Sequence, residues 1–206
     1  MTGREPRLLL GAGVVLLVLS GIGPRDRVTW LLEVAPILIA VPILILTARR
    51  FPLTPLAHRL IFAHALVLML GGHYTYAEVP LGSWAEHALG LARNPYDRLG
   101  HFMQGFGPAI VAREILIRRS PLEPGKWLTV LVLSVCLAIS ALYEMTEWWT
   151  ALIAGEAAEA FLGTQGDQWD TQWDMFLALV GATAALALLS RIHDRQITRL
   201  EETSHV

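Results

Sequence analysis

The sequence contains a single cysteine, Cys136, among 206 residues. One cysteine cannot form an intrachain disulfide, and it excludes a metal site built on paired cysteines. The sequence also contains no HExxH, HxH, GxSxG or GK[ST] motif and no GxGxxG in a suitable context. These absences remove the usual signatures of zinc proteases, serine hydrolases and nucleotide-binding proteins.

Charged residues are also scarce, at 17% of the chain, whereas apolar residues make up 54%. The mean hydropathy is +0.48, which is too apolar for a soluble domain of this size and typical of a membrane protein. The net charge of −2 gives no support for nucleic-acid binding. We expect one membrane domain over residues 1–206, without internal repeats, and the lipid bilayer as its first partner.

Six apolar segments are separated by short polar stretches, which predicts an all-α polytopic bundle of six transmembrane helices. The first is short and follows a basic N-terminus, but lacks a small-x-small cleavage site, so we interpret it as an uncleaved membrane helix. A polar stretch over residues 73–95 suits a short amphipathic helix at the membrane interface. The expected spans are approximately residues 8–22, 28–48, 53–72, 96–117, 127–153 and 171–192.

Basic residues in the connecting segments predict the orientation, because cytoplasmic loops of membrane proteins are enriched in lysine and arginine. With a cytoplasmic N-terminus, the outer side holds only Arg25, Arg27 and Arg93. We therefore expect a multi-pass protein of the bacterial inner membrane with both termini in the cytoplasm. The basic residues then on the cytoplasmic side are Arg4, Arg7, Arg49, Arg50, Arg118, Arg119, Lys126, Arg191, Arg195 and Arg199.

Acidic residues gather where the last apolar segment begins, in the stretch FLGTQGDQWDTQWDMFLALVG over residues 161–181. Asp167, Asp170 and Asp174 would enter the membrane there, and charges at that depth are expensive unless they have a role. Asp170 and Asp174 are four residues apart, so they share one face of a helix. The small residues that follow, at positions 178, 181, 182 and 185, let helices approach closely.

Two other helices bring polar side chains to the same end of the bundle. Asp97, His101 and Gln104 follow i, i+4, i+7 spacing, and Glu144 and Glu147 follow i, i+3 spacing, so each set lies on one helix face. Carboxylates with an imidazole suit a divalent metal, a proton relay or a general acid–base pair.

The candidate catalytic residues, which are also the candidate metal ligands, are therefore Asp97, His101, Glu144 and Asp174. The candidate supporting residues are Glu147, Asp170, Asp167, Tyr74 and His73. A divalent metal is the candidate cofactor.

Structural explanations compete with this one. Asp97 with Arg98, or Glu144 or Asp174 with a nearby arginine, would form ion pairs that hold helices together, and acids outnumber the available bases. Asp167 would then only cap the last helix. His64, alone on an apolar face, is expected to be a hydrogen-bonded core residue. Six of the seven tryptophans fall on the outer side, which favours a packed structure there rather than a membrane belt alone.

Several long motifs resemble those of the YjdF-type bacterial inner-membrane proteins, and they occur in order across residues 20–195. That resemblance implies a membrane location and no particular reaction. The motifs are RVTWLLEVAPILI, RRFPLTPL, GGHYTYAEVP, RNPYDRLGHFMQGF, ALYEMTEWW and FLGTQGDQWDTQWDMF.

A fainter resemblance is to VanZ-like membrane proteins, whose pattern is Asp-Lys-x-x-His, then Tyr-Glu-x-x-Gln, then a final aspartate. The chain has Asp97 to His101, Tyr143 to Glu147, and Asp174 in these places, with Arg98 instead of lysine and Glu147 instead of glutamine. The resemblance implies a role in glycopeptide tolerance or envelope stress.

Three functions remain open. The first is a membrane-embedded enzyme that acts on a lipid or lipid-linked envelope molecule at the outer leaflet. The second is an accessory membrane protein whose polar cluster only fixes helix packing. The third is a proton-coupled transporter, which is disfavoured because the acids lie at one end of the helices instead of near the midplane.

Overall fold

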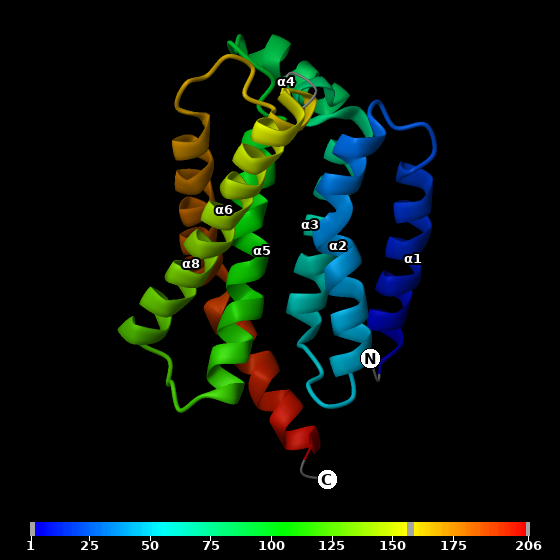
Figure 1. Ribbon diagram of the computed structural model, residues 1–206. Helices are drawn as coiled ribbons and strands as arrows, with labels where there is room; N and C mark the ends of the chain where they lie inside the picture. Colours follow the sequence, from blue (N-terminus) through cyan, green and yellow to red (C-terminus); the bar gives the residue numbers. More distant parts are fainter. Residues whose placement is uncertain (1–2, 156–158, 205–206) are drawn as a thin grey trace.

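The computed structural model describes residues 3–155 and 159–204, and in these ranges the regular structure is entirely helical (Figure 1). This confirms the all-α prediction. The helices are α1 (Arg4–Ser20), α2 (Arg27–Thr47), α3 (Pro55–Tyr74), η1 (Tyr76–Glu78), α4 (Pro80–Leu89), α5 (Tyr96–Arg119), α6 (Lys126–Ala154), α7 (Glu159–Leu162) and α8 (Asp170–Ser204).

Four of the described helices are long and apolar enough to cross a membrane: α2, α3, Lys126–Ile153 of α6, and Asp170–Glu202 of α8. The predicted number of six spans is therefore not confirmed. Helix α1 has only 17 residues, and α5 carries charged side chains at both ends, including Asp97, Arg113 and Glu114. Length and apolarity alone do not qualify either helix as a span.

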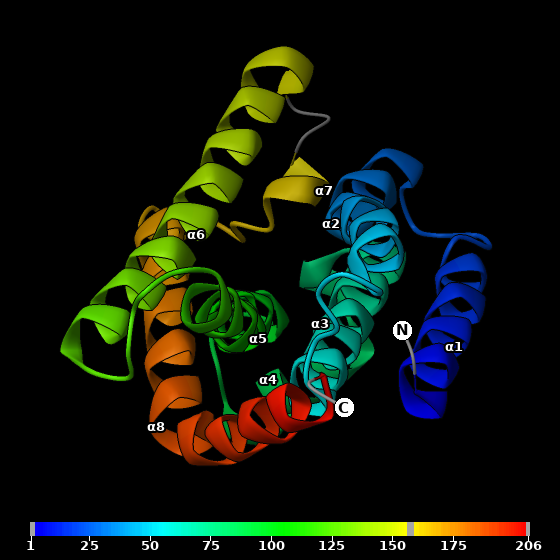
Figure 2. The ribbon, with the colours of Figure 1, turned by 90° about the horizontal axis from the view of Figure 1, so that it is seen from below.

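The last helix is longer than the sequence predicts. Its apolar segment was expected to end near residue 192, but α8 continues to Ser204. The charged tail stays helical and passes beneath the bundle toward the start of α3 (Figure 2), where Gln196 Oε1 accepts a hydrogen bond of 2.8 Å from the Leu56 amide. The tail therefore stays helical although it is no longer apolar, and it is held against the start of α3.

Helix α5 occupies the middle of the bundle, and α3, α6 and α8 pack against it (Figure 2). The α5–α8 contact is the closest, because glycines on both helices face the partner's backbone. A Cβ added at Gly105 would lie 1.8 Å from the Ala178 carbonyl oxygen, and one at Gly181 would lie 2.0 Å from the Phe102 carbonyl oxygen. The small residues predicted for α8 therefore allow this approach.

A tight apolar layer fills the middle of this contact. Its members come from α3, α5, α6 and α8 and are almost completely buried: Ala57, Ala109, Ile110, Leu128, Val132, Cys136, Ala182 and Ala185. The outer surface is apolar too, since Leu46, Leu152 and Ile153 are 78%, 67% and 88% exposed. Such a surface is typical of helices that face lipid.

Both chain termini lie at one end of the bundle, and α4 lies at the opposite end, which we call the cap end (Figure 1). At the end with the termini, Glu114 of α5 is completely buried. Its carboxylate accepts hydrogen bonds from the Thr54 amide at 2.9 Å and the Thr54 hydroxyl at 2.7 Å. It also lies 2.7 Å from Arg118 Nη1 and 3.1 Å from His193 Nε2.

This arrangement continues through His193 of α8, which is also completely buried. Its Nδ1 lies 3.1 Å from Arg113 Nη1, and Arg113 Nη2 donates to Asp194 at 2.7 Å. We call Glu114, Arg118, His193, Arg113 and Asp194 the termini-end network. It joins the start of α3, the end of α5 and the C-terminal part of α8, with each carboxylate matched by cationic or hydroxyl donors.

Candidate functional site

The predicted polar faces of α5, α6 and α8 meet at the cap end of the bundle. On α5, Asp97, His101 and Gln104 point the same way and are 6%, 5% and 8% exposed. Glu144 on α6 and Asp174 on α8 are 7% and 2% exposed. We call Asp97, His101, Glu144, Glu147, Asp170 and Asp174 the cap-end cluster.

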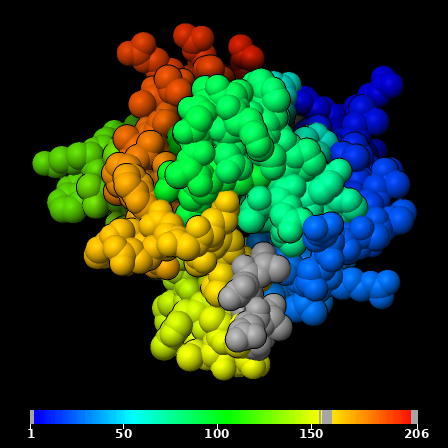
Figure 3. Space-filling model, turned by 90° about the horizontal axis from the view of Figure 1, so that it is seen from above, coloured from blue at the N-terminus to red at the C-terminus, as the bar shows by residue number. Residues whose placement is uncertain are grey.

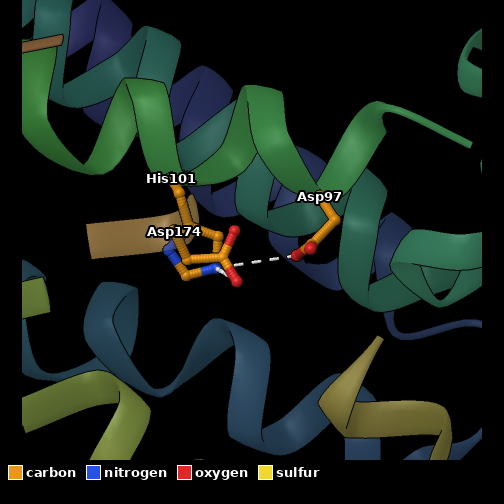
Figure 4. A group of neighbouring side chains, drawn as sticks. All are labelled: Asp97, His101 and Asp174. Atoms are coloured by element: carbon orange, nitrogen blue, oxygen red, sulfur yellow. Dashed lines mark ion pairs between the residues drawn. The ribbon is translucent and has the colours of Figure 1, made fainter. Parts of the chain in front are cut away.

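His101 stands at the centre of the cluster, with a carboxylate near each of its ring nitrogens. Its Nε2 lies 3.6 Å from Asp97 Oδ1 and 3.8 Å from Asp174 Oδ2 (Figure 4). Its Nδ1 lies 3.7 Å from Glu144 Oε1 and 3.2 Å from the amide oxygen of Gln104. Since an amide oxygen only accepts hydrogen bonds, Nδ1 carries the proton in this contact.

With the proton on Nδ1, the lone pair of a neutral imidazole is on Nε2, where it faces two carboxylates. Three negative or electron-rich groups around one point repel one another unless a cation lies between them. The cation is either a second proton on His101 or a metal ion. Histidine ligands of metals commonly donate their other N–H to a second acceptor, as Nδ1 does here toward Gln104.

Two overlapping sets of side chains have metal-ligand spacing. In each set, one ligand atom per residue lies within 4.8 Å of all the others: Asp97, His101 and Asp174 form one set, and His101, Glu144 and Glu147 form the other. Two oxygens in these sets, Glu144 Oε1 and Asp174 Oδ1, are buried and find no hydrogen-bond partner among the described residues. Buried carboxylate oxygens without partners are rare and call for a bound group.

An arginine that the sequence analysis did not single out neutralises another part of the cluster. Arg93 precedes α5, and its Nη2 lies 3.1 Å from Asp97 Oδ2. Its Nη1 pairs closely with Asp170 and lies 3.7 Å from Asp167 Oδ2. The predicted partner of Asp97, Arg98, instead pairs with Asp167 at 3.2 Å. That prediction was wrong because adjacent residues on a helix point in different directions, so Arg98 faces away from Asp97, whereas Arg93 reaches Asp97 from the segment before α5.

The alternative prediction that Glu144 or Asp174 pairs with an arginine also differs from the structure. The ion pairs formed by these two carboxylates among the described residues are with His101. Arginine therefore neutralises Asp167 and Asp170, while the ion pairs of Glu144 and Asp174 in the described ranges are with the imidazole. The cluster divides into a paired half and an unpaired half.

A small cavity opens beside Asp97, His101 and Glu147 of the cluster. Its volume of about 20 Å³ is sufficient for roughly one water molecule or ion. Tyr143, which lines it, donates a hydrogen bond of 2.8 Å to Glu33, and Glu33 on α2 is 3% exposed. The complete lining is Glu33, His64, Leu68, Tyr76, Asp97, Gly100, His101, Gln104, Tyr143 and Glu147.

Tyr76 reaches this cavity through a slot between two helices. A Cβ at Gly71 of α3 would lie 2.3 Å from the Tyr76 ring, and one at Gly100 of α5 would lie 2.6 Å from it. Both glycines therefore make room for the ring. Sequence reasoning missed Tyr76 because it lies in η1, outside any periodic pattern; the glycines at 71 and 100 were the available signal.

His64 also lines the cavity, and its role differs from the expectation. Its Nε2 is buried without a hydrogen-bond partner among the described residues. The prediction that His64 is a hydrogen-bonded core residue is therefore wrong for this nitrogen.

Two predicted supporting residues lie elsewhere. His73 Nδ1 is hydrogen-bonded to the Ser20 carbonyl at 2.8 Å, and Tyr74 packs edge-on against His73 and is 37% exposed. Neither residue forms a side-chain hydrogen bond or ion pair with the cap-end cluster in the described ranges. Asp167 does lie beside the cluster through Arg93, and its Oδ1 accepts a hydrogen bond of 2.9 Å from the Trp169 amide just before α8 begins.

The cluster is covered from the cap end. Figure 3 shows that the segment containing η1 and α4 and the segment just before α8 cover much of this face. Of the six tryptophans predicted to pack on this side, Trp30 does so, against the Val34, Ile37, Leu68 and Met69 cluster, whereas the other five are exposed. Their exposures range from 45% to 68% for Trp84, Trp148, Trp149, Trp169 and Trp173. Exposed tryptophans near the end of a helix bundle are typical of the membrane interface.

Comparison with known proteins supports a membrane assignment. A family model described as "Predicted membrane protein (DUF2238)" matches residues 5–195. The chain belongs to this family. It is also 56% identical over 185 residues to the inner membrane protein YjdF of Escherichia coli (strain K12). The matched region covers 90% of this chain and 88% of that protein. No solved structure matches. These matches confirm the YjdF-type resemblance, while the VanZ-like one stays a prediction.

Proposed function

We propose that this YjdF-like membrane protein binds a divalent cation in its cap-end cluster, with Asp97, His101 and Asp174 as ligands. The cluster would face the periplasm, and the protein would be a membrane-embedded enzyme acting on a lipid or lipid-linked envelope molecule. The observation that carries the proposal is the imidazole Nε2 between two carboxylates, 3.6 and 3.8 Å away, beside carboxylate oxygens that have no partner in the described chain.

The donor set favours a borderline divalent ion. Imidazole suits zinc, iron and related metals, whereas carboxylates also suit manganese and magnesium. Three protein ligands are typical of catalytic metal sites, which keep a coordination position for water or substrate. Such an ion would polarise a phosphoryl or acyl oxygen. Glu144 and Glu147, on the Nδ1 side of His101, are placed to accept a proton from a reacting group.

The proposed location requires six spans with both termini in the cytoplasm. Helices α1 and α5 would supply the two spans that length and apolarity do not establish. For α5 this is physically reasonable, because α3, α6 and α8 surround it and its buried charges have partners within the bundle. The basic residues at the end with the termini favour the cytoplasm there.

Reporter fusions test this orientation. A periplasmic phosphatase fused after Glu159 should be active, and fusions after Glu123 or Ser204 should be inactive. Activity after either of the latter positions would reverse the orientation and place the cluster at the cytoplasmic face.

Metal binding tests the site itself. The purified wild-type protein, stripped with chelator and titrated with Zn²⁺ or Mn²⁺, should bind about one ion per chain. Asp174→Asn and His101→Gln should each weaken that binding by at least about 10-fold. Glu86→Gln, which removes a carboxylate from α4 outside the cluster, is the matched control and should bind as the wild type does. Equal affinity in all four proteins would contradict the proposal.

A specific observation favours the accessory-protein alternative for half of the cluster. Arg93 pairs with Asp97 and Asp170 as a structural ion pair would. If folded wild-type protein binds no divalent ion, and Glu144→Gln and Asp174→Asn both prevent folding, the cluster only holds helices together. Transport is the weaker reading, because the apolar layer containing Ile110, Val132 and Cys136 separates the two polar ends of the bundle.

A further inference from the structure

Arg98 lies at the edge of the cap-end cluster and donates one side-chain hydrogen bond among the described residues, to Asp167. Its side chain is 37% exposed and forms one ion pair, with Asp167 Oδ2 at 3.2 Å. Its Nε finds no partner among the described residues. A guanidinium has five N–H donors in a planar fork, and this fork matches the oxygens of a phosphate.

An aromatic ring holds the guanidinium in place. The Arg98 Cζ atom lies 5.5 Å from the centroid of the Trp173 ring, within the range of a cation–π contact. Trp173 in turn packs against Phe176, with ring centroids 5.9 Å apart. The fork is therefore oriented before any ligand arrives.

An apolar strip runs along α8 from this point toward the middle of the bundle. Trp173, Phe176 and Val180 are spaced three and four residues apart, so they share one helix face. They are 45%, 52% and 37% exposed. A cationic fork at the head of an exposed apolar strip matches a lipid, which has a charged phosphate at one end and an acyl chain at the other.

We propose that Arg98 and Trp173 bind the phosphate of an anionic membrane lipid whose acyl chain lies along the Trp173–Phe176–Val180 strip. The inference rests on the proposed function, because this headgroup would be the group presented to the cation site. The connection is short: Asp167 Oδ2, which pairs with Arg98, lies 3.7 Å from Arg93 Nη1, and Arg93 holds the ligand Asp97.

The surrounding acids make the two binding events depend on each other. Glu144 and Asp174, which pair with His101 and with no arginine among the described residues, repel an approaching phosphate until a cation offsets their charge. A bound divalent ion therefore strengthens lipid binding, and by reciprocity the lipid strengthens binding of the ion by the same factor.

Native mass spectrometry of protein from mixed micelles tests the proposal, with phosphatidylglycerol and phosphatidylcholine supplied in equal amounts. The wild type should retain phosphatidylglycerol over phosphatidylcholine by about 5-fold or more when Zn²⁺ is present, and less after chelation. Arg98→Gln should lose this preference. Arg25→Gln is the matched control, because Arg25 is an exposed arginine in a cap-end loop that pairs with Glu78; it should keep the preference.

Two further results would also test the lipid proposal. Loss of phosphatidylglycerol on addition of millimolar inorganic phosphate would show a free-phosphate site and overturn the lipid proposal. Should Arg98→Gln not fold, Arg98→Lys, which keeps the charge but not the fork, must lower retention, and undiminished retention would contradict the proposal.

The same samples test the lipid inference and the proposed cation site separately. Normal Zn²⁺ binding with an unchanged lipid preference in Arg98→Gln defeats the lipid inference alone. Absence of Zn²⁺ and Mn²⁺ binding by the wild type defeats the proposed function, whatever lipid is retained.

Discussion

Two buried polar groups lie at opposite ends of the same helix, α5, and they are built in opposite ways. In the termini-end network, Glu114 accepts from Thr54, Arg118 and His193, so its carboxylate is fully matched. In the cap-end cluster, the ion pairs of Glu144 and Asp174 are with His101 and not with an arginine, and each carboxylate has an oxygen without a partner among the described residues.

The difference separates a structural role from a functional one. A satisfied buried network fixes how helices meet, and removing one member leaves the others unpaired. An acid-rich cluster with unpaired oxygens costs stability, and a folded protein tolerates such a cost mainly where it binds or reacts. We therefore expect mutations in the two groups to have opposite consequences for stability and for binding.

The largest effect should come from Glu114→Gln in the termini-end network. The substitution leaves Arg118 and His193 buried without their anionic partner, so the free energy of unfolding should fall by about 3–5 kcal/mol. Unfolding of purified protein in mixed micelles, followed by circular dichroism, measures this loss. Glu123→Gln, in the exposed loop at the same end, should change stability little; equal losses in both would show that Glu114 is not specially placed.

A somewhat smaller effect is expected where α5 and α8 touch between the two groups. Gly181→Ala would place a Cβ 2.0 Å from the Phe102 carbonyl oxygen, and the helices must separate to accommodate it. The expected loss is about 1–3 kcal/mol, measured by the same unfolding assay.

The matched control for that prediction is Gly11→Ala in α1, where a new Cβ meets nothing within 4 Å. Alanine in an open helical position should be neutral or stabilise by about 0.5–1 kcal/mol. If Gly181→Ala behaves like Gly11→Ala, the α5–α8 interface is looser than the structure shows.

The sequence predicted the parts of the cap-end cluster that depend on local spacing. Asp97 with His101, and Asp170 with Asp174, share helix faces by i, i+4 periodicity, which needs no tertiary information. We predicted that these residues would lie close together because the predicted topology places their helix ends on the same side of the membrane. The apolar segments were likewise visible because composition changes sharply at their ends.

The partners that lie outside regular helical patterns could not be predicted. Arg93 precedes α5 and Tyr76 lies in a short 3-10 helix, so their positions depend on loop paths that hydrophobic periodicity does not encode. The termini-end network was missed for a related reason. Glu114 and Arg113 are adjacent on α5, but their partners come from α3 and α8, up to 81 positions apart in sequence.

Asp174→Asn extends the comparison, because it should not lower the free energy of unfolding as Glu114→Gln does. In metal-free protein, the change removes one of the carboxylates that face His101 without creating a cavity. Stability should therefore stay within about 1 kcal/mol of the wild type or rise. Thermal unfolding with and without Zn²⁺ measures both stability and binding: the ion should raise the melting temperature of the wild type and raise that of Asp174→Asn by less. A large loss of stability in the metal-free variant would assign the cap-end cluster a structural role.

The smallest effect is expected for Cys136→Ala, in the apolar layer that separates the two polar groups. Cys136 is fully buried on α6, and its Sγ makes only a long contact of 3.8 Å to the Gly105 carbonyl oxygen. Losing one sulfur atom leaves a small gap, so the cost should be below about 1 kcal/mol. The level of membrane-inserted protein and its Zn²⁺ affinity should both be unchanged. If the affinity falls while stability holds, the layer transmits changes to the cap-end cluster, and the two ends of α5 are not independent.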